Sequence, residues 1–140
     1  MNITDAIAKL HSEKCSLVIC KGDTLSCYHK RGVADLLNIL RNDPVILKDA
    51  VIADKVVGKG AAALMVIGGI KELYTDVISR PALDLLEEHG IVTGYGKLVP
   101  NIINRSGTGI CPVERLCMQC VTPADCLTEI IEFVNTYGKN

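Results

Sequence analysis

The segment from Val51 to Met65 holds the densest group of residues whose types and spacing could do chemistry. It reads VIADKVVGKGAAALM, an apolar strand-like run followed by charged residues, two glycines and a helix of small side chains. A strand that enters a helix through small residues presents free backbone N–H groups, which bind anions. The segment therefore predicts a ligand site. The predicted binding residues within it are Asp54, Lys55, Gly58, Lys59 and Gly60.

These residue types suggest a division of roles. We expect Lys59 and the backbone N–H groups of residues 57–60 to hold a phosphate or carboxylate, and Asp54 to accept hydrogen bonds from a sugar or base. The two glycines would let a ligand approach the backbone closely. The segment lacks the Gly-x4-Gly-Lys-Ser/Thr pattern of a P-loop. A structural interpretation stays open, in which Asp54 caps a helix and both lysines are solvated.

The stretch from Arg105 to Glu114, RSGTGICPVE, is a second candidate. Two glycines flank Thr108 and Arg105 lies nearby, which suits a lid that contacts phosphate. Cys111 directly precedes a predicted helix, whose dipole should lower the pKa of the thiol. The alternative is a surface loop with Glu114 near the start of its own helix. The catalytic role is left unknown, with Asp54, Lys59 and Cys111 as candidates.

Four cysteines near the C-terminus form a third candidate. Their spacing is Cys-x5-Cys-x2-Cys-x5-Cys, and such a set could bind Zn²⁺ or an iron–sulfur cluster. Two of them, three residues apart on one helical face, would also suit small buried side chains. Both interpretations stay open. The residues are Cys111, Cys117, Cys120 and Cys126.

The other cysteines and the histidines predict less chemistry. The sequence carries seven cysteines and no recognisable signal peptide, so we expect a cytoplasmic protein whose cysteines are free thiols or metal ligands. The three cysteines near the predicted hairpin are interpreted as core or edge thiols. No two histidines have metal-ligand spacing. The residues concerned are Cys15, Cys20, Cys27, His11, His29 and His89.

Composition limits the class of partner. The chain of 140 residues is 49% hydrophobic with a net charge of −1, which predicts one globular domain over residues 1–140 and no general attraction to nucleic acid or anionic membranes. No apolar run approaches the roughly 20 residues of a membrane span. Aromatic residues make up only 4%, so base-stacking surfaces of RNA-binding proteins are not expected.

Hydrophobic periodicity gives the elements that must position these residues. A helix capped by Thr4, a β-hairpin and a second helix precede strands that alternate with helices. Helical crossovers make the later strands mostly parallel, and the hairpin supplies an antiparallel edge. We therefore predict a three-layer α/β/α sandwich with a mixed sheet. The predicted helices are 5–14, 33–40, 57–67, 81–89, 111–120 and one from 123, and the predicted strands are 16–20, 24–28, 51–53, 73–78 and 91–95, with a loop over 96–109.

Three stretches carry a resemblance to a known family. They are VIADKVVGK at 51–59, Gly90-Ile91 with the following KLVP at 97–100, and TGICPVE at 108–114. With the order of elements, they resemble a small uncharacterised bacterial and archaeal family that carries only a domain-of-unknown-function label. That resemblance implies a cytidine deaminase-like fold and covers most of the chain, from the hairpin to about residue 116.

The zinc motifs of deaminases do not accompany the resemblance. Those enzymes need His/Cys-x-Glu at one helix start and Pro-Cys-x-x-Cys at the next. The first candidate triplet here, at residues 54–56, is Asp-Lys-Val. At the second helix start Pro81 matches the proline, but Ala82 and Leu85 replace both cysteines. Zinc is therefore not expected at the deaminase position, and zinc-dependent deamination is not predicted.

The leading functional hypothesis is a protein that binds a nucleotide- or nucleoside-like ligand at a degenerate deaminase-type site. Whether it is an enzyme, and which cofactor it uses, the sequence leaves unknown. One alternative is a Zn or Fe–S protein ligated by the cysteines of residues 111–126. Another is a non-catalytic scaffold or regulatory subunit. Because related folds commonly oligomerise, a homo-oligomer is a further hypothesis.

Overall fold

A five-stranded mixed sheet forms the centre of the molecule. The computed structural model describes residues 1–30 and 32–137. The strands lie in the order β2-β1-β3-β4-β5, with β1 antiparallel to β2 and β3, and β3, β4 and β5 mutually parallel. The predicted antiparallel hairpin edge and parallel later strands are thus confirmed. The strands are β1 Leu17–Lys21, β2 Thr24–Tyr28, β3 Val51–Val57, β4 Glu72–Ser79 and β5 Val92–Val99.

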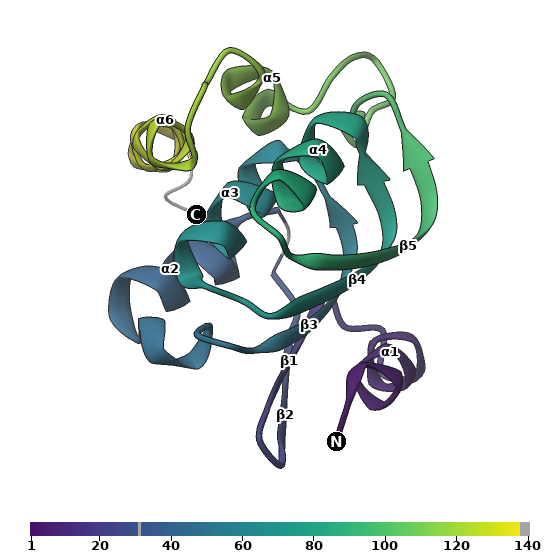
Figure 1. Ribbon diagram of the computed structural model, residues 1–140. Coiled ribbons are helices and arrows are strands. Elements are labelled where there is room, and N and C mark those ends of the chain that lie inside the picture. The colour runs from purple at the N-terminus through teal and green to yellow at the C-terminus, as the bar shows by residue number, and fades with distance from the viewer. Residues whose placement is uncertain (31, 138–140) are drawn as a thin grey trace.

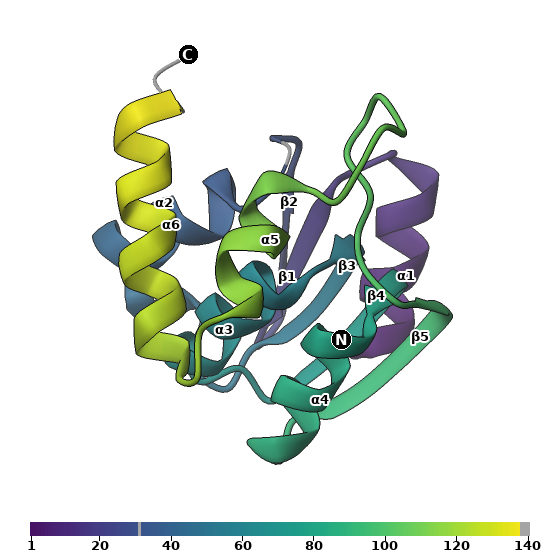
Figure 2. The same ribbon diagram turned by 90° about the horizontal axis from the view of Figure 1, so that it is seen from above.

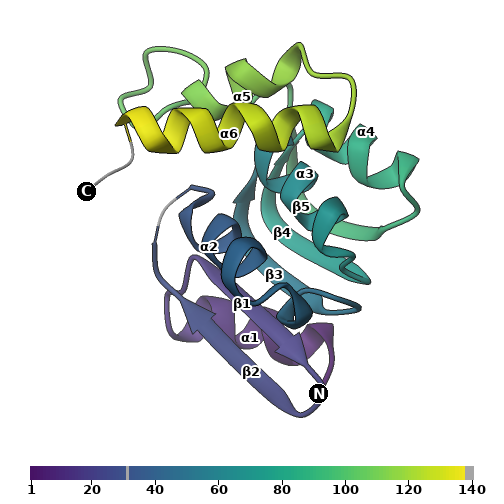
Figure 3. The same cartoon turned by 90° about the vertical axis from the view of Figure 1, so that its left-hand side faces the viewer.

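Helices cover the sheet unevenly (Figure 1). Helix α1 alone lies on one face, against β1, β3 and β4, whereas α2, α3 and α4 lie on the other. Helices α5 and α6 form an outer layer on α3, with α6 seen along its length in Figure 2 and both helices across the top of Figure 3. The helices are α1 Ile3–Ser12, α2 Ala34–Asn42, α3 Lys59–Gly68, α4 Arg80–Glu88, α5 Pro112–Met118 and α6 Pro123–Tyr137, with a 3-10 turn at Pro44–Ile46.

Local sequence explains most element ends. Helix α1 begins two residues earlier than predicted, because Asn2 and Asp5 form a reciprocal capping box and Thr4 lies inside the helix. Helix α4 begins after Ser79, whose Oγ accepts a hydrogen bond from the Ala82 N–H. Helix α3 ends at Gly69, which has φ 76°, a left-handed conformation that favours glycine.

Two strands are longer than their hydrophobic patterns predict. Strand β3 continues through residue 57, so its predicted end at residue 53 is wrong. Backbone pairing with β4 carries the strand past Asp54, whose partner in the register is Thr75. Strand β5 likewise runs to residue 99, through part of the predicted loop, because it pairs with β4 along its whole length. Asp54 therefore lies inside a strand and caps no helix.

The main core lies between the sheet and the α2–α4 layer. Helix α3 occupies its centre and is buried on all sides over residues 60–65, which explains its row of small side chains. Helix α6 contributes Cys126 and Ile130 from the outer layer. A smaller core joins α1 to β1 and β3 through Ala6, Leu10 and Val18. Among the described residues, no helix has the length and apolarity needed to cross a membrane.

One cysteine prediction is wrong. Cys15, just before β1, and Cys27, in β2, form a disulfide bond and are not free thiols. The hairpin register places their Cα atoms 6.0 Å apart, which is within the usual range for a disulfide. Cys20 remains a free, buried thiol on β1.

Candidate functional site

A cavity of about 550 Å³ opens beside the carboxyl-terminal half of β3. Three separate parts of the chain enclose it: the junction of the hairpin with α2, strand β3 with the start of α3, and the segment from Ile102 to Glu114. Most of its wall is apolar, including Val33, Leu36 and Val113. The volume falls in the range of small-molecule sites.

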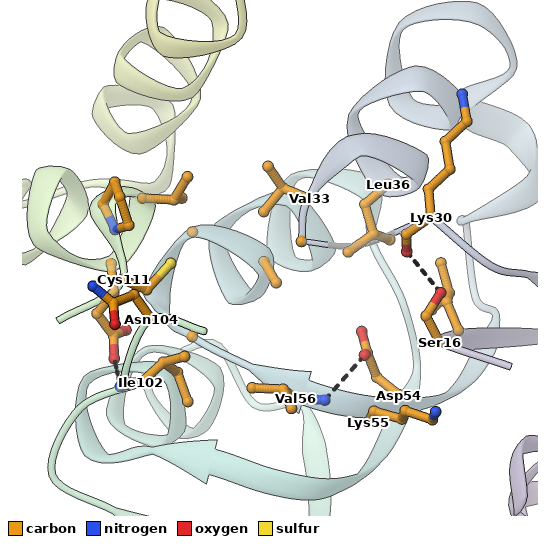
Figure 4. A pocket seen from close by; sticks show the side chains of 18 of the residues that line it. Ser16, Lys30, Val33, Leu36, Asp54, Lys55, Val56, Ile102, Asn104 and Cys111 are labelled. Atoms are coloured by element: carbon orange, nitrogen blue, oxygen red, sulfur yellow. Dashed lines mark hydrogen bonds between the residues drawn. The ribbon is translucent and has the colours of Figure 1, made fainter. Parts of the chain in front are cut away.

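Asp54 is one of two buried acidic residues on the wall of this cavity, the other being Glu114. Its side chain is 9% exposed, and its carboxyl points into the hollow (Figure 4). Asp54 Oδ1 accepts a hydrogen bond of 3.3 Å from the Val56 N–H. Desolvation by burial raises the pKa of Asp54 from 3.8 to about 7, against the lowering effect of hydrogen bonds from the backbone of Val56 and Lys55. Near neutral pH this carboxyl can therefore either accept or donate a hydrogen bond.

The start of α3 is already occupied by an anion from the chain itself. Glu114 of α5 is 1% exposed, and its Oε1 accepts hydrogen bonds from the Lys59 N–H at 2.7 Å and the Ser79 Oγ at 3.0 Å. Its Oε2 accepts a third from the Ile102 N–H. A single carboxylate thus accepts from the first N–H of α3 and from the hydroxyl of Ser79, the residue that caps α4. The structure places this side chain where we had expected a ligand phosphate at α3.

The glycines at this helix start accommodate the same contact. A Cβ atom at Gly58 would lie 2.9 Å from Glu114 Oε1, and one at Gly60 would lie 2.5 Å from Val113 Cγ1. The sequence predicts that the two glycines let a ligand approach the backbone closely. The structure instead shows α5 approaching α3 at both glycines.

Lys59 points away from the cavity. Its Nζ donates a hydrogen bond of 2.6 Å to the Cys120 carbonyl, in the turn between α5 and α6, and Lys59 is absent from the cavity wall. Asp54 and the Lys59 amine therefore do not face each other. Lys55 follows Asp54 in β3, so strand alternation directs its side chain away from the Asp54 carboxyl, although the residue still borders the cavity.

Only part of the predicted lid lines the cavity. Arg105 and the half-buried Cys111 line the cavity. An isolated bridge between Ile103 and Ile110 closes the loop that carries both Arg105 and Thr108. Thr108 is absent from the cavity wall, and its N–H donates to Asn104 Oδ1 at 3.0 Å. Of the predicted binding residues, those on the cavity wall are Asp54, Lys55, Gly58, Gly60 and Arg105, and those away from it are Lys59 and Thr108.

Three of the four C-terminal cysteines come together elsewhere. Interactions with the Cys117 and Cys120 thiols lower the pKa of Cys126 to about 7, with help from the Lys59 ammonium and against desolvation by burial. Burial, followed by the interaction with Cys126, raises the pKa of the Cys120 thiol to about 11. Cys111 lies on the cavity wall instead. The four thiols therefore do not form one ligand set.

Sequence reasoning missed the hairpin side of the cavity. Ser16, Lys30 and Leu36 line it although they precede Asp54 by 18 or more positions. The feature that brings these residues to the cavity is the pairing of β1 with β3 in the sheet. Because β1 runs antiparallel to β3, the start of β1 meets the end of β3, with Leu17 opposite Asp54 and the Lys55 N–H donating to the Ser16 carbonyl. The pairing of the hairpin with β3, which the sequence does not specify, decides which residues face Asp54.

Fold and site together define an α/β protein with a mixed five-stranded sheet and a buried aspartate in a cavity beside it. A family model described as "Domain of unknown function (DUF1893)", TM1506, matches residues 5–134, so the chain belongs to this family. The crystal structure of a DUF1893 family protein, TM1506 from Thermotoga maritima, superposes with a TM-score of 0.86 at 23% sequence identity, over 93% of this chain and 88% of that one. No curated protein matches the chain.

Proposed function

We propose that this protein binds a small nucleoside-like molecule, with its ring system inside the cavity and a ring or exocyclic N–H donating to Asp54. The observation that carries the proposal is the Asp54 carboxyl, which is buried in a cavity of about 550 Å³ and satisfied by the backbone at one oxygen. A buried carboxyl facing a mostly apolar hollow gives orientation and specificity to a polar ring.

The placement of charge refines the ligand class. The N-terminus of α3 holds Glu114, so we assign no phosphate to it. The positively charged residues Lys30 and Arg105 both border the cavity, and both are exposed. A phosphate carried by the ligand would therefore lie at the rim, while the ring occupies the interior. A nucleoside and a nucleotide would make the same contacts inside the cavity, and only the nucleotide would place a phosphate at this rim.

A cytidine deaminase-like ancestry is consistent with this proposal but does not carry it. In that interpretation, the starts of α3 and α4 would mark the deaminase metal position. Here those helix starts share a Glu114 carboxylate that receives hydrogen bonds from Lys59, Ile102 and Ser79. With neither imidazole nor thiolate from the motif positions, the chain lacks the ligand set on which zinc-dependent deamination relies.

Calorimetry with nucleobases, nucleosides and nucleotides at millimolar concentration tests the proposal. We expect binding by at least one ring class, weakened about tenfold or more in Asp54→Asn, because a hydrogen bond to a charged group contributes about 1.5–3 kcal/mol. Asp84→Asn, an exposed aspartate on α4, is the matched control and should bind as the wild type does. The absence of heat across the whole panel, or equal binding by Asp54→Asn, would refute the proposal.

A further inference from the structure

A second group of chemically competent side chains lies on the α1 face of the sheet. The sulfur atoms of Cys15 and Cys27 and a ring nitrogen of His29 all lie within 4.8 Å of one another. Cys15 is buried, Cys27 is half-buried and His29 is exposed. Neither the cavity nor the proposed function uses any of the three.

We propose that Cys15, Cys27 and His29 form a zinc-type metal site whenever the Cys15–Cys27 disulfide is reduced. Two thiolates and an imidazole are ligands that Zn²⁺ prefers, and three protein ligands leave a fourth position for water. Two thiolates also neutralise the charge of a divalent ion, which suits a half-buried site. Because His29 is exposed, the fourth position faces solvent.

The backbone keeps these residues together without the disulfide. Before β1 the chain reverses at Lys14, which has φ 52°, and the Cys15 N–H then donates to the Leu10 carbonyl at 3.2 Å. The Ser16 N–H donates to the Tyr28 carbonyl at 2.9 Å. These bonds fix Cys15 beside the strand that carries Cys27.

A side-chain clamp fixes the histidine end as well. Ser16 Oγ lies 3.0 Å from the Tyr28 carbonyl and 2.7 Å from the Lys30 carbonyl, the two residues that flank His29. Opening the S–S bond therefore leaves the backbone at all three ligands held by the hairpin pairing and by the Ser16 contacts. Only side-chain rotation is needed for the two sulfurs to separate to the spacing of a zinc-bound pair, and metal binding then releases both thiol protons.

The disulfide and the metal are alternatives, because each uses the same two sulfurs. A reduced chain is expected to bind one ion, and an oxidised chain none at this place. Reduction by a phosphine converts the disulfide to two thiols with water supplying the oxygen of the phosphine oxide, so it introduces no competing thiol ligand.

The test uses the full chain, reduced with a phosphine, stripped with a chelator and titrated with Co²⁺ and then Zn²⁺. We expect one ion per chain with a thiolate-to-cobalt charge-transfer band, and loss of that band in the oxidised protein. His29→Ala should weaken binding by at least about tenfold, since even partners that only orient a ligand are worth 10–100-fold. His89→Ala, which removes a histidine far from the group, is the control and should change nothing.

Two further variants keep the result decisive. Cys27→Ser should abolish binding, and Cys126→Ser should preserve it, because Cys126 belongs to the separate thiol group at the α5–α6 turn. Since the His29 side chain is exposed, its variant is expected to fold, and circular dichroism checks this. The proposal is overturned if the reduced protein binds no zinc, if His29→Ala binds as tightly as wild type, or if Cys126→Ser removes the metal.

Discussion

At the scale of single residues, the raised pKa of Asp54 in the cavity should make the free energy of unfolding depend on pH. Its pKa is about 7 in the folded chain and near its ordinary 3.8 when unfolded, so the folded state binds the proton more tightly. The stability contributed by the protonated carboxyl is complete below pH 4 and is lost as pH rises through 7. Between pH 5 and pH 8 this group alone should lower the free energy of unfolding by roughly 2–3 kcal/mol.

Substituting Asp54→Asn should therefore flatten the pH dependence of stability. Urea unfolding at pH 5, 6, 7 and 8 measures the slope for the wild type, for Asp54→Asn and for the exposed-carboxylate variant Asp84→Asn. We expect a wild-type slope in Asp84→Asn and a clearly smaller one in Asp54→Asn. Identical slopes in all three proteins would show that Asp54 titrates normally.

At the scale of elements, the contact between α3 and α5 depends on Gly60. An alanine within a helix usually gains about 1 kcal/mol over glycine. Here the added Cβ would lie 2.5 Å from Val113 Cγ1, and the β-branched valine has little freedom to turn aside. Overpacking of this kind costs about 1–3 kcal/mol, so we expect Gly60→Ala to destabilise the protein by about 1 kcal/mol net.

Thermal unfolding of paired variants measures this balance. Gly109→Ala is the control, because a Cβ there meets nothing within 4 Å. It should change stability by no more than about 0.5 kcal/mol. A Gly60→Ala protein more stable than wild type would mean that α5 shifts freely on α3, contrary to the close packing described above.

The limits of sequence reasoning also appear at the scale of elements. Periodicity located the helices and the strands, because burial on one face leaves a regular pattern, and the helical crossovers predicted that the later strands are parallel. It ended β3 at residue 53, since the charged pair of Asp54 and Lys55 interrupts an apolar run that backbone pairing with β4 continues. Asp54 and Arg105 were predicted site residues and do lie on one cavity. The roles of Lys59 and Glu114 depend on how α5 packs on α3, and no local pattern encodes that contact.

At the scale of the whole molecule, Glu114 joins parts of the chain that are distant in sequence. Its carboxylate connects α5 to the starts of α3 and α4 and to the backbone at Ile102, which is part of the cavity wall. Glu114→Ala would remove the acceptor of the buried Ser79 hydroxyl and of the part-buried Lys59 and Ile102 N–H groups, at about 1–3 kcal/mol for each group left unsatisfied. We therefore expect a loss of at least about 3 kcal/mol in chemical unfolding.

The same substitution should loosen the cavity, because residues 102–114 form one of its three walls. Hydrogen exchange should accelerate at the backbone amides of Lys59 and Ile102, which lose their acceptor, more than in strand β1. Glu132→Ala, an exposed glutamate on α6, should match the wild type in both measurements. If Glu114→Ala retained wild-type stability and exchange, the two helix starts would have found other acceptors, and the wall of the cavity would not depend on this carboxylate.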